Sequence, residues 1–207
     1  MSEEQLSRKE RERLQHKHEI LDTALRLFSE QGFHNVSMQQ IADASEFSVG
    51  TLYNFFSSKE ALFDELIQAC AERIIDSSVA ILDAPGTEVD RLIRFIRHAP
   101  KLLEEHASFT KLYVSELGVR GAKLSKRRDK DDIETAINSR LLELIAAGIR
   151  KGVFRRVDPA ITAKTLKSII ETLAFEMAGQ FDKNEAKEMF DKVEQLFIDG
   201  LLLPEGK

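Results

Sequence analysis

The sequence predicts an all-α fold of about nine helices, and three observations support it. The 207 residues include only 10 Gly and 4 Pro, few for a chain rich in turns. No run of alternating apolar and polar residues lies between turn signals, so strands are not expected. Apolar residues instead recur every three or four positions, which is the spacing of one helix face. With 43% hydrophobic and 31% charged residues, the composition is that of a globular chain of one or two domains.

The first helix is expected from about Glu12 to Gln31, with Gly32 ending it at a position where helices often carry Gly. Just before and within its start, the segment from Arg8 to Lys17 holds five cations and two carboxylates, a net charge of +3. This segment is either an arm that binds phosphates or a solvated extension of the helix.

Two short helices are expected next, each with its own start signal. Ser37 is followed three residues later by Gln40, the spacing of a capping box, and Ile41 and Ala42 then give a short apolar face. A second start at Ser48 precedes apolar residues at helical spacing, which leaves small and polar residues on the other side. This pattern of two short helices and a tight turn indicates a helix-turn-helix.

The stretch from Ser37 to Ala61 resembles the DNA-binding signature of the TetR family of one-component repressors. The resemblance is carried by Ser37-Met38, Ile41-Ala42, the run SVGTLY from Ser48 to Tyr53, Phe56, and the residues Lys59 to Leu62. It implies an N-terminal arm and helix-turn-helix domain over residues 1–58, followed by a helical regulatory and dimerisation domain over residues 59–207.

The resemblance also implies roles for individual residues, with the third helix in the major groove. Asn and Gln side chains can pair bidentately with adenine, and Gly allows close approach, so Gln39, Gly50 and Asn54 are the expected base-contacting residues. Hydroxyls and Lys at helix starts hold phosphates, and the expected phosphate contacts are Ser37, Thr51, Tyr53 and Lys59.

Two positions depart from the family pattern. Glu46 stands in the turn where relatives usually carry Gly, so either the packing of Phe47 offsets a strained backbone or the turn geometry differs. Phe55 stands where relatives often have a His or Tyr that contacts phosphate, and its ring cannot donate a hydrogen bond.

Six further helices are expected after the helix-turn-helix domain, which is called the head below. Pro100 is expected to kink or break the fifth, and Asp158 followed by Pro159 is a strong start signal for the eighth. The expected ranges are 59 to about 83, 87 to about 103, 107–118, a longer helix from the basic run 123–130 to Gly152, 159–181 and 184–202.

The regulatory domain is expected to bind a small-molecule effector and a second copy of the chain. Polar groups set among apolar ones are typical of a ligand cavity, and the candidates are His98, His106, Phe109, Tyr113, Glu116 and Met177. The broad apolar stripes of the last two helices suggest a homodimer, because a palindromic site needs a two-fold protein. The interface candidates are Ile169, Leu173, Phe190, Val193 and Phe197.

Other function classes are disfavoured. The sequence contains no GxSxG, P-loop, HExxH, Cys-x-x-Cys or Glu-x-x-His motif, so we expect no enzyme activity, no cofactor and no metal site. One cysteine, no long apolar run and a charged N-terminus predict a cytoplasmic protein without a membrane span. The predicted function is a ligand-responsive transcriptional regulator, most simply a repressor of a palindromic operator. The alternative is a helical sensor or protein-interaction module that no longer binds DNA.

Overall fold

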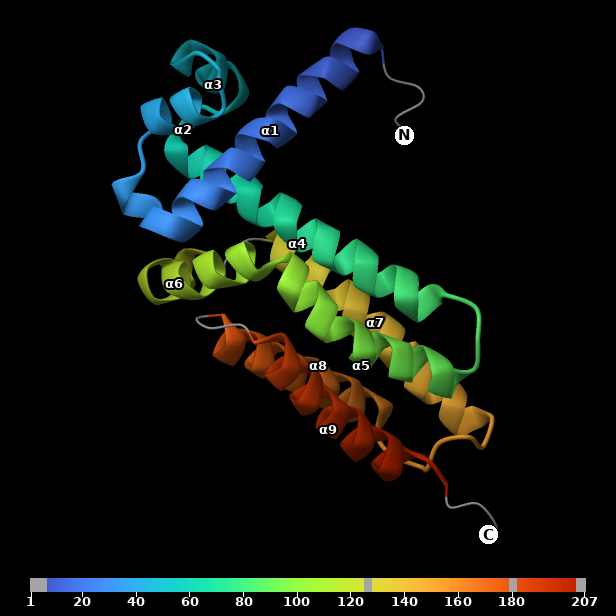
Figure 1. The fold of residues 1–207 in the computed structure, drawn as a ribbon. Coiled ribbons are helices and arrows are strands. Elements are labelled where there is room, and N and C mark those ends of the chain that lie inside the picture. The colour runs from blue at the N-terminus through green and yellow to red at the C-terminus, as the bar shows by residue number, and fades with distance from the viewer. Residues whose placement is uncertain (1–6, 125–127, 179–181, 204–207) are drawn as a thin grey trace. The chain divides into compact units, whose positions relative to one another are not determined.

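The structure, a computed structural model, describes residues 7–124, 128–178 and 182–203, without the side chains of 117–134. Over these residues the chain forms nine α-helices and one short 3-10 turn, which confirms the predicted all-α fold (Figure 1). The elements are α1 (Arg8–Gln31), η2 (Phe33–Asn35), α2 (Met38–Ala44), α3 (Val49–Phe55), α4 (Lys59–Asp83), α5 (Glu88–Glu105), α6 (Ala107–Leu124), α7 (Arg128–Arg150), α8 (Pro159–Met177) and α9 (Lys183–Leu201). In the described ranges, no helix combines the length and the hydropathy of a membrane span.

Local capping explains where several helices begin. The predicted capping box of Ser37 and Gln40 is present, and Thr87 with Asp90 forms another at the start of α5. The side chain of Asp158 accepts hydrogen bonds from two backbone N–H groups at the start of α8, as predicted. α1 begins at Arg8, four residues earlier than expected, because Ser7 caps it.

Pro100 does not break α5, which continues through it to Glu105. A proline inside a helix removes one backbone hydrogen bond and crowds the preceding turn. The helix persists because its apolar face is packed before and after Pro100, with Phe95, Ile96 and Ala99 in the core and Leu103 partly buried against it. Tertiary packing therefore overrides the local signal.

The chain divides into two compact units, Met1–Cys70 and Ala71–Lys207, and α4 runs from the first into the second. The first unit has a core of aromatic rings from α1, η2 and α4. Phe63 lies 5.9 Å from Phe28 and 4.8 Å from Phe33, measured between ring centroids. Cys70, three turns into α4, is only 3% exposed. The first turns of α4 thus complete the core of the three preceding helices.

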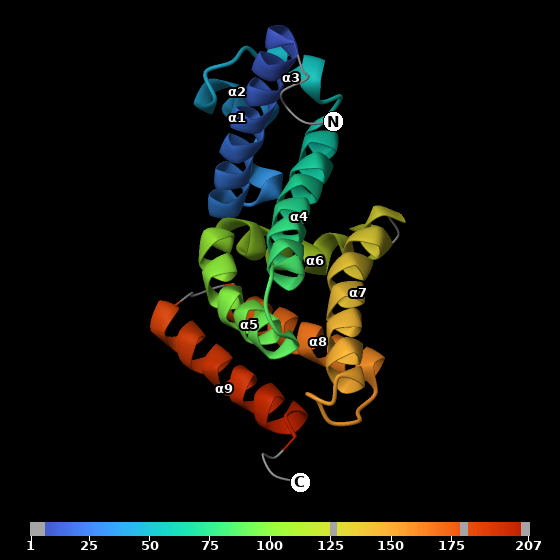
Figure 2. The same cartoon turned by 90° about the vertical axis from the view of Figure 1, so that its right-hand side faces the viewer.

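The second unit is built around α5, α7, α8 and α9. α9 packs against α5, α5 against α7, and α7 against α8, so the four helices follow that order (Figure 2). Their apolar faces form one core that includes Leu92, Leu141, Leu166 and Phe190, each at most 2% exposed. Arg97 of α5 and Glu194 of α9 add an ion pair with two hydrogen bonds at the edge of this core.

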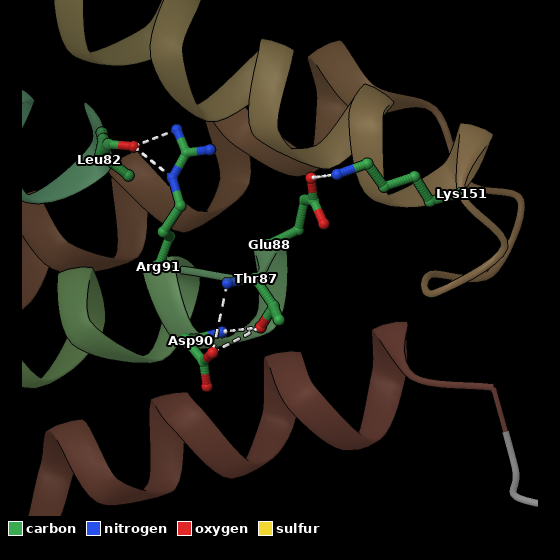
Figure 3. Close-up of polar contacts among 6 residues, drawn as sticks. All are labelled: Leu82, Thr87, Glu88, Asp90, Arg91 and Lys151. Carbon is green, nitrogen blue, oxygen red and sulfur yellow. Dashed lines mark hydrogen bonds and ion pairs between the residues drawn. The ribbon is translucent and has the colours of Figure 1, made fainter. Parts of the chain in front are cut away.

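Polar contacts join the start of α5 to the ends of α4 and α7 (Figure 3). Glu88 is 6% exposed, and its carboxylate accepts a hydrogen bond of 2.6 Å from the Lys151 ammonium. The Arg91 guanidinium donates to the backbone carbonyl of Leu82 in the last turn of α4, with an Nε–O distance of 2.6 Å. The hydrogen bond from Lys151 holds the pKa of the Glu88 carboxyl below its ordinary value.

Changing Glu88 to Gln is expected to reduce stability at neutral pH. A carboxyl whose pKa is lowered by folding stabilises the native state above its unfolded pKa, about 4.3 for glutamate, and that contribution is lost as the pH falls through the folded value. Because Lys151 is largely exposed, the expected loss at pH 7 is only about 1 kcal/mol.

Urea unfolding from pH 7 to pH 3 measures this effect. The variant should lose less stability on acidification than the parent does. The matched control is Glu171→Gln, which removes an exposed carboxylate that pairs with Lys167 on α8. Equal pH profiles for the parent and the Glu88 variant would contradict the assignment.

Candidate DNA-binding surface

The turn between α2 and α3 is strained at one residue. Glu46 has a φ of 60°, the left-handed region, and no other non-glycine residue in the described ranges has a positive φ. This conformation costs roughly 1–2 kcal/mol for a residue with a Cβ. The Phe47 N–H donates to the Ala42 carbonyl at 3.0 Å, and the Phe47 ring lies 5.0 Å from the His16 ring of α1. Of the two alternatives for this turn, the structure shows the strained backbone, with packing of Phe47 available to offset it.

The amino-terminal ends of α2 and α3 are both capped by serine. The Ser37 hydroxyl accepts a hydrogen bond from the Gln40 N–H and donates to the Gln40 side chain. Ser48 caps α3, and its hydroxyl lies 2.8 Å from that of Thr51. The candidate hydroxyls of Ser37 and Thr51 thus hold the helix starts in place. The oxygen of a hydroxyl has further hydrogen-bonding capacity, so this local role leaves room for a phosphate contact.

An open groove of about 480 Å³ lies where α2, α3 and the start of α4 meet. It brings together three of the four phosphate candidates, Ser37, Tyr53 and Lys59, with the base candidate Gln39. Its remaining lining residues are His34, Asn35, Val36, Met38 and Val49. A groove of this kind combines a cation, a phenol and a helix start, which are the groups that bind phosphate oxygens.

Lys59 does more in this groove than the sequence suggested. Its ammonium donates to the backbone carbonyls of Phe33 at 2.9 Å and Val36 at 2.8 Å, and lies 4.3 Å from the centroid of the Phe33 ring. The residue therefore ties the start of α4 to the segment that leads into the Ser37 cap. Because an ammonium carries three donors, one N–H is left for an external acceptor.

The three residues predicted to contact bases are all exposed to solvent. Gly50 and Asn54 are exposed on α3, and Tyr53 between them is 54% exposed. The Gln39 amide donates to the Asp43 carboxylate at 2.7 Å, one turn further along α2. Asp43 was not among the predicted residues, although its spacing of four from Gln39 marks it as a neighbour on the helix surface.

The comparison with known proteins decides the identity of this head. A family model described as bacterial regulatory proteins of the tetR family matches residues 20–66, which include α2, α3 and the start of α4. Residues 20–66 therefore carry the DNA-binding domain of the TetR family. The function of the chain is accordingly that of a helix-turn-helix transcriptional regulator rather than an enzyme.

Individual relatives are similar over most of their length. The HTH-type transcriptional regulator YhgD of Bacillus subtilis is 21% identical over 182 residues, which cover 88% of this chain and 94% of YhgD. The HTH-type transcriptional repressor KstR2 of Mycobacterium tuberculosis is 26% identical over 137 residues, 66% of this chain and 68% of KstR2. The solved structure of the latter, a ketosteroid transcriptional regulator, superimposes with a TM-score of 0.67 at 20% identity, covering 91% of this chain and 95% of that one.

The candidate effector residues lie on α5, α6 and α8 and at the end of α5. The Phe109 and Tyr113 rings of α6 lie 5.7 Å apart, and Tyr113 stacks on Phe175 of α8 at 6.2 Å. Met177 and Glu116 are buried, at 7% and 5% exposed.

The two candidate histidines lie on α5 and at its end. The His98 ring lies 3.0 Å from the Ser77 hydroxyl of α4, and His106 caps the end of α5. Burial lowers the pKa of both imidazoles.

Three of the dimer candidates belong to the chain's own core. Phe190, Val193 and Phe197 are at most 8% exposed within the core shared with α5. Ile169 and Leu173 are half-buried against the same core. The stripe chosen from the sequence is therefore the inward one, because a helical repeat does not reveal which partner covers it. The exposed apolar residues are instead Ile161 and Phe175 on α8, Leu196 on α9 and Leu203 beyond it.

Proposed function

We propose that this protein is a TetR-family repressor that binds a palindromic operator as a homodimer and leaves it when a small molecule binds to residues 59–207. The groove that Ser37, Tyr53 and Lys59 line beside the exposed face of α3 is the observation that carries the proposal. Residues 1–58 form the DNA-binding part of this scheme.

Affinity and specificity come from different side chains in this proposal. Ser37, Thr51, Tyr53 and Lys59 bind backbone phosphates, so binding weakens with salt. Gln39, Gly50 and Asn54 contact base edges in the major groove. The bond to Asp43 restrains the Gln39 amide, which limits the bases it can pair with.

The homodimer forms through the outward faces of α8 and α9. Ile161, Thr165, Ser168 and Thr172 are all exposed on α8, at a spacing that places them on one side of the helix. Leu196 is 64% exposed on α9. Exposed large apolar side chains such as Ile161 and Leu196 are typical of a surface that another molecule covers.

The effector is a mostly apolar small molecule. The rings of Phe109, Tyr113 and Phe175 form a row between α6 and α8 that offers such a molecule flat apolar surface. Met177 and the polar candidates His98, His106 and Glu116 complete the proposed lining. An effector that prefers the form unable to bind DNA by about 1–3 kcal/mol lowers operator affinity roughly 5- to 150-fold.

Selection from a library of random duplexes tests the function. We expect enrichment of a palindrome with two half-sites about one helical turn apart, and anisotropy titrations that show dimeric stoichiometry. If no sequence is enriched, and Tyr53→Ala and Lys59→Ala bind DNA as well as the parent does, the repressor proposal is wrong. A sensor or interaction module then takes its place.

Two variants separate base contacts from phosphate contacts. Asn54→Ala is expected to flatten the preference at one or two operator positions, because a bidentate pair contributes about 1–3 kcal/mol against a wrong base. Lys59→Ala is expected to weaken binding to every sequence alike. Titrations against the selected operator and its single-base variants distinguish these outcomes, and an unchanged base preference in the Asn54 variant would remove that residue from the contact set.

A further inference from the structure

The amino-terminal part of α1 is an exposed, positively charged helix. Ser7 and Glu10 form a capping box that begins the helix at Arg8, so the segment predicted as either an arm or an extension is helical. Its side chains are exposed from Arg8 to His16. In Figure 1 these first turns extend past α2 and α3.

Two of the five cations in this segment form ion pairs with carboxylates. Arg8 pairs with Glu12 at 2.8 Å, and Lys17 pairs with Glu65 of α4. Arg13 differs, because its guanidinium carbon lies 5.6 Å from the centroid of the Phe55 ring. In the part of the chain that the structure describes, no carboxylate forms an ion pair with Arg13.

The position of this contact links α1 to the proposed DNA surface. Phe55 is the last residue of α3 and directly follows the exposed Asn54. Two neighbouring contacts hold α1 against the same element, with His16 on Phe47 at one end of α3 and Lys17 5.9 Å from the Phe56 ring at the other. Arg13 therefore lies beside the end of α3, on a part of α1 that these two contacts hold in place.

The chemistry of the pair leaves Arg13 free to bind an anion. The side chain of Phe55 has no polar atom, so it offers no hydrogen-bond donor at the end of α3. A cation–π contact involves the positive charge and the ring face but consumes none of the five guanidinium N–H groups. A guanidinium with free donors matches the geometry of a phosphate, which it binds bidentately.

We propose that Arg13 is a further DNA-contacting residue, held by Phe55 so that it donates to a backbone phosphate beside the end of α3. The inference rests on the proposed function, since it needs α3 in the major groove. A homodimer carries this contact twice, once in each half-site.

Anisotropy titrations at several salt concentrations test the proposal. The probe is a fluorescein-labelled duplex about three helical turns long. Its sequence is mixed, because a phosphate contact does not depend on sequence. Arg13→Ala is expected to weaken binding on the order of tenfold at low salt and to reduce the slope of log K against log salt by about 2 per dimer. Arg13→Lys should keep most of the slope, because it keeps the charge.

Two further variants act as the control and as a test of the Phe55 contact. Arg26→Ala removes the same side chain from the same helix at a site where it pairs with Glu30, and should bind within about twofold of the parent. Phe55→Leu should weaken binding by itself, and adding it to Arg13→Ala should cause no further loss, since the two residues act as one unit.

The outcomes are distinct. If Arg13→Ala and Arg26→Ala have the same affinity and salt slope while the parent binds DNA, the Arg13 proposal fails and the repressor proposal stands. A parent that does not bind any duplex overturns both. A lower thermal unfolding midpoint in Arg13→Ala, with the slope retained at low temperature, would assign the residue to folding instead.

Discussion

Replacing Gly148 by Ala is expected to lower the free energy of unfolding by about 2–3 kcal/mol. A Cβ at this position in α7 would lie less than 3.0 Å from three carbons of the Phe154 ring. The ring is only 2% exposed, and the backbone N–H groups of Val153 and Phe154 both donate to the Gly148 carbonyl. These hydrogen bonds tie the backbone of Phe154 to that of Gly148. The Phe154 ring and the new methyl group therefore cannot easily move apart.

Thermal unfolding without DNA measures this loss, with an expected fall in the midpoint of roughly 5–10 °C for a chain of this size. Gly50→Ala is the matched control, because its nearest neighbour would be the Ser48 hydroxyl at 3.7 Å. There the better helix propensity of Ala should leave stability unchanged or raise it. A double variant of Gly148→Ala with Phe154→Leu should lose less than the sum of the two single changes. Additive losses would show that the ring is not the obstacle.

Replacing Leu196 by Glu is expected to dissociate the proposed homodimer and to lower operator affinity by about two to four orders of magnitude. Leu196 is 64% exposed in the single chain, so the change leaves the core of the monomer intact. In an interface, however, the carboxylate would be buried without a partner. A single head then loses the gain in effective concentration that two linked heads share on a palindrome.

Light scattering gives the mass, and anisotropy on the selected operator gives the affinity. Gln195→Glu adds the same charge one residue earlier on an exposed part of α9 and should remain dimeric. If Leu196→Glu stays dimeric, the interface lies elsewhere. If the parent itself is a monomer at micromolar concentration, the homodimer proposal is wrong.

Helix starts were predicted well because their signals are local. The capping box at Ser37 and the Asp158 cap depend on residues three positions apart or fewer, which the sequence displays directly. Ser7 and Glu10 have the same spacing at the start of α1, so the predicted start at Glu12 lies inside the helix. Pro100 shows the limit of local signals, since burial of α5 keeps the helix intact.

A motif singled out several residues that line the candidate DNA surface, but it did not predict their contacts within the chain. Lys59 was assigned to phosphate alone, yet it binds two carbonyls more than twenty residues earlier in the chain. Contacts over that separation depend on how the loop folds back, which no spacing rule encodes. The interface candidates Phe190 and Val193 failed to mark an outward face for the same reason, because periodicity identifies an apolar stripe but not the partner that covers it.

Because Cys70 is buried, the rate at which its thiol is modified reports local opening around α4. Cys70 is the single cysteine of the chain, so a thiol reagent labels one site, and at 3% exposure that site reacts only when its surroundings open. The rate of modification under native conditions therefore reports the free energy of that opening without any engineered label. Slower modification on adding operator, and faster modification on adding an effector, would report the steps of the proposed regulatory cycle at this residue.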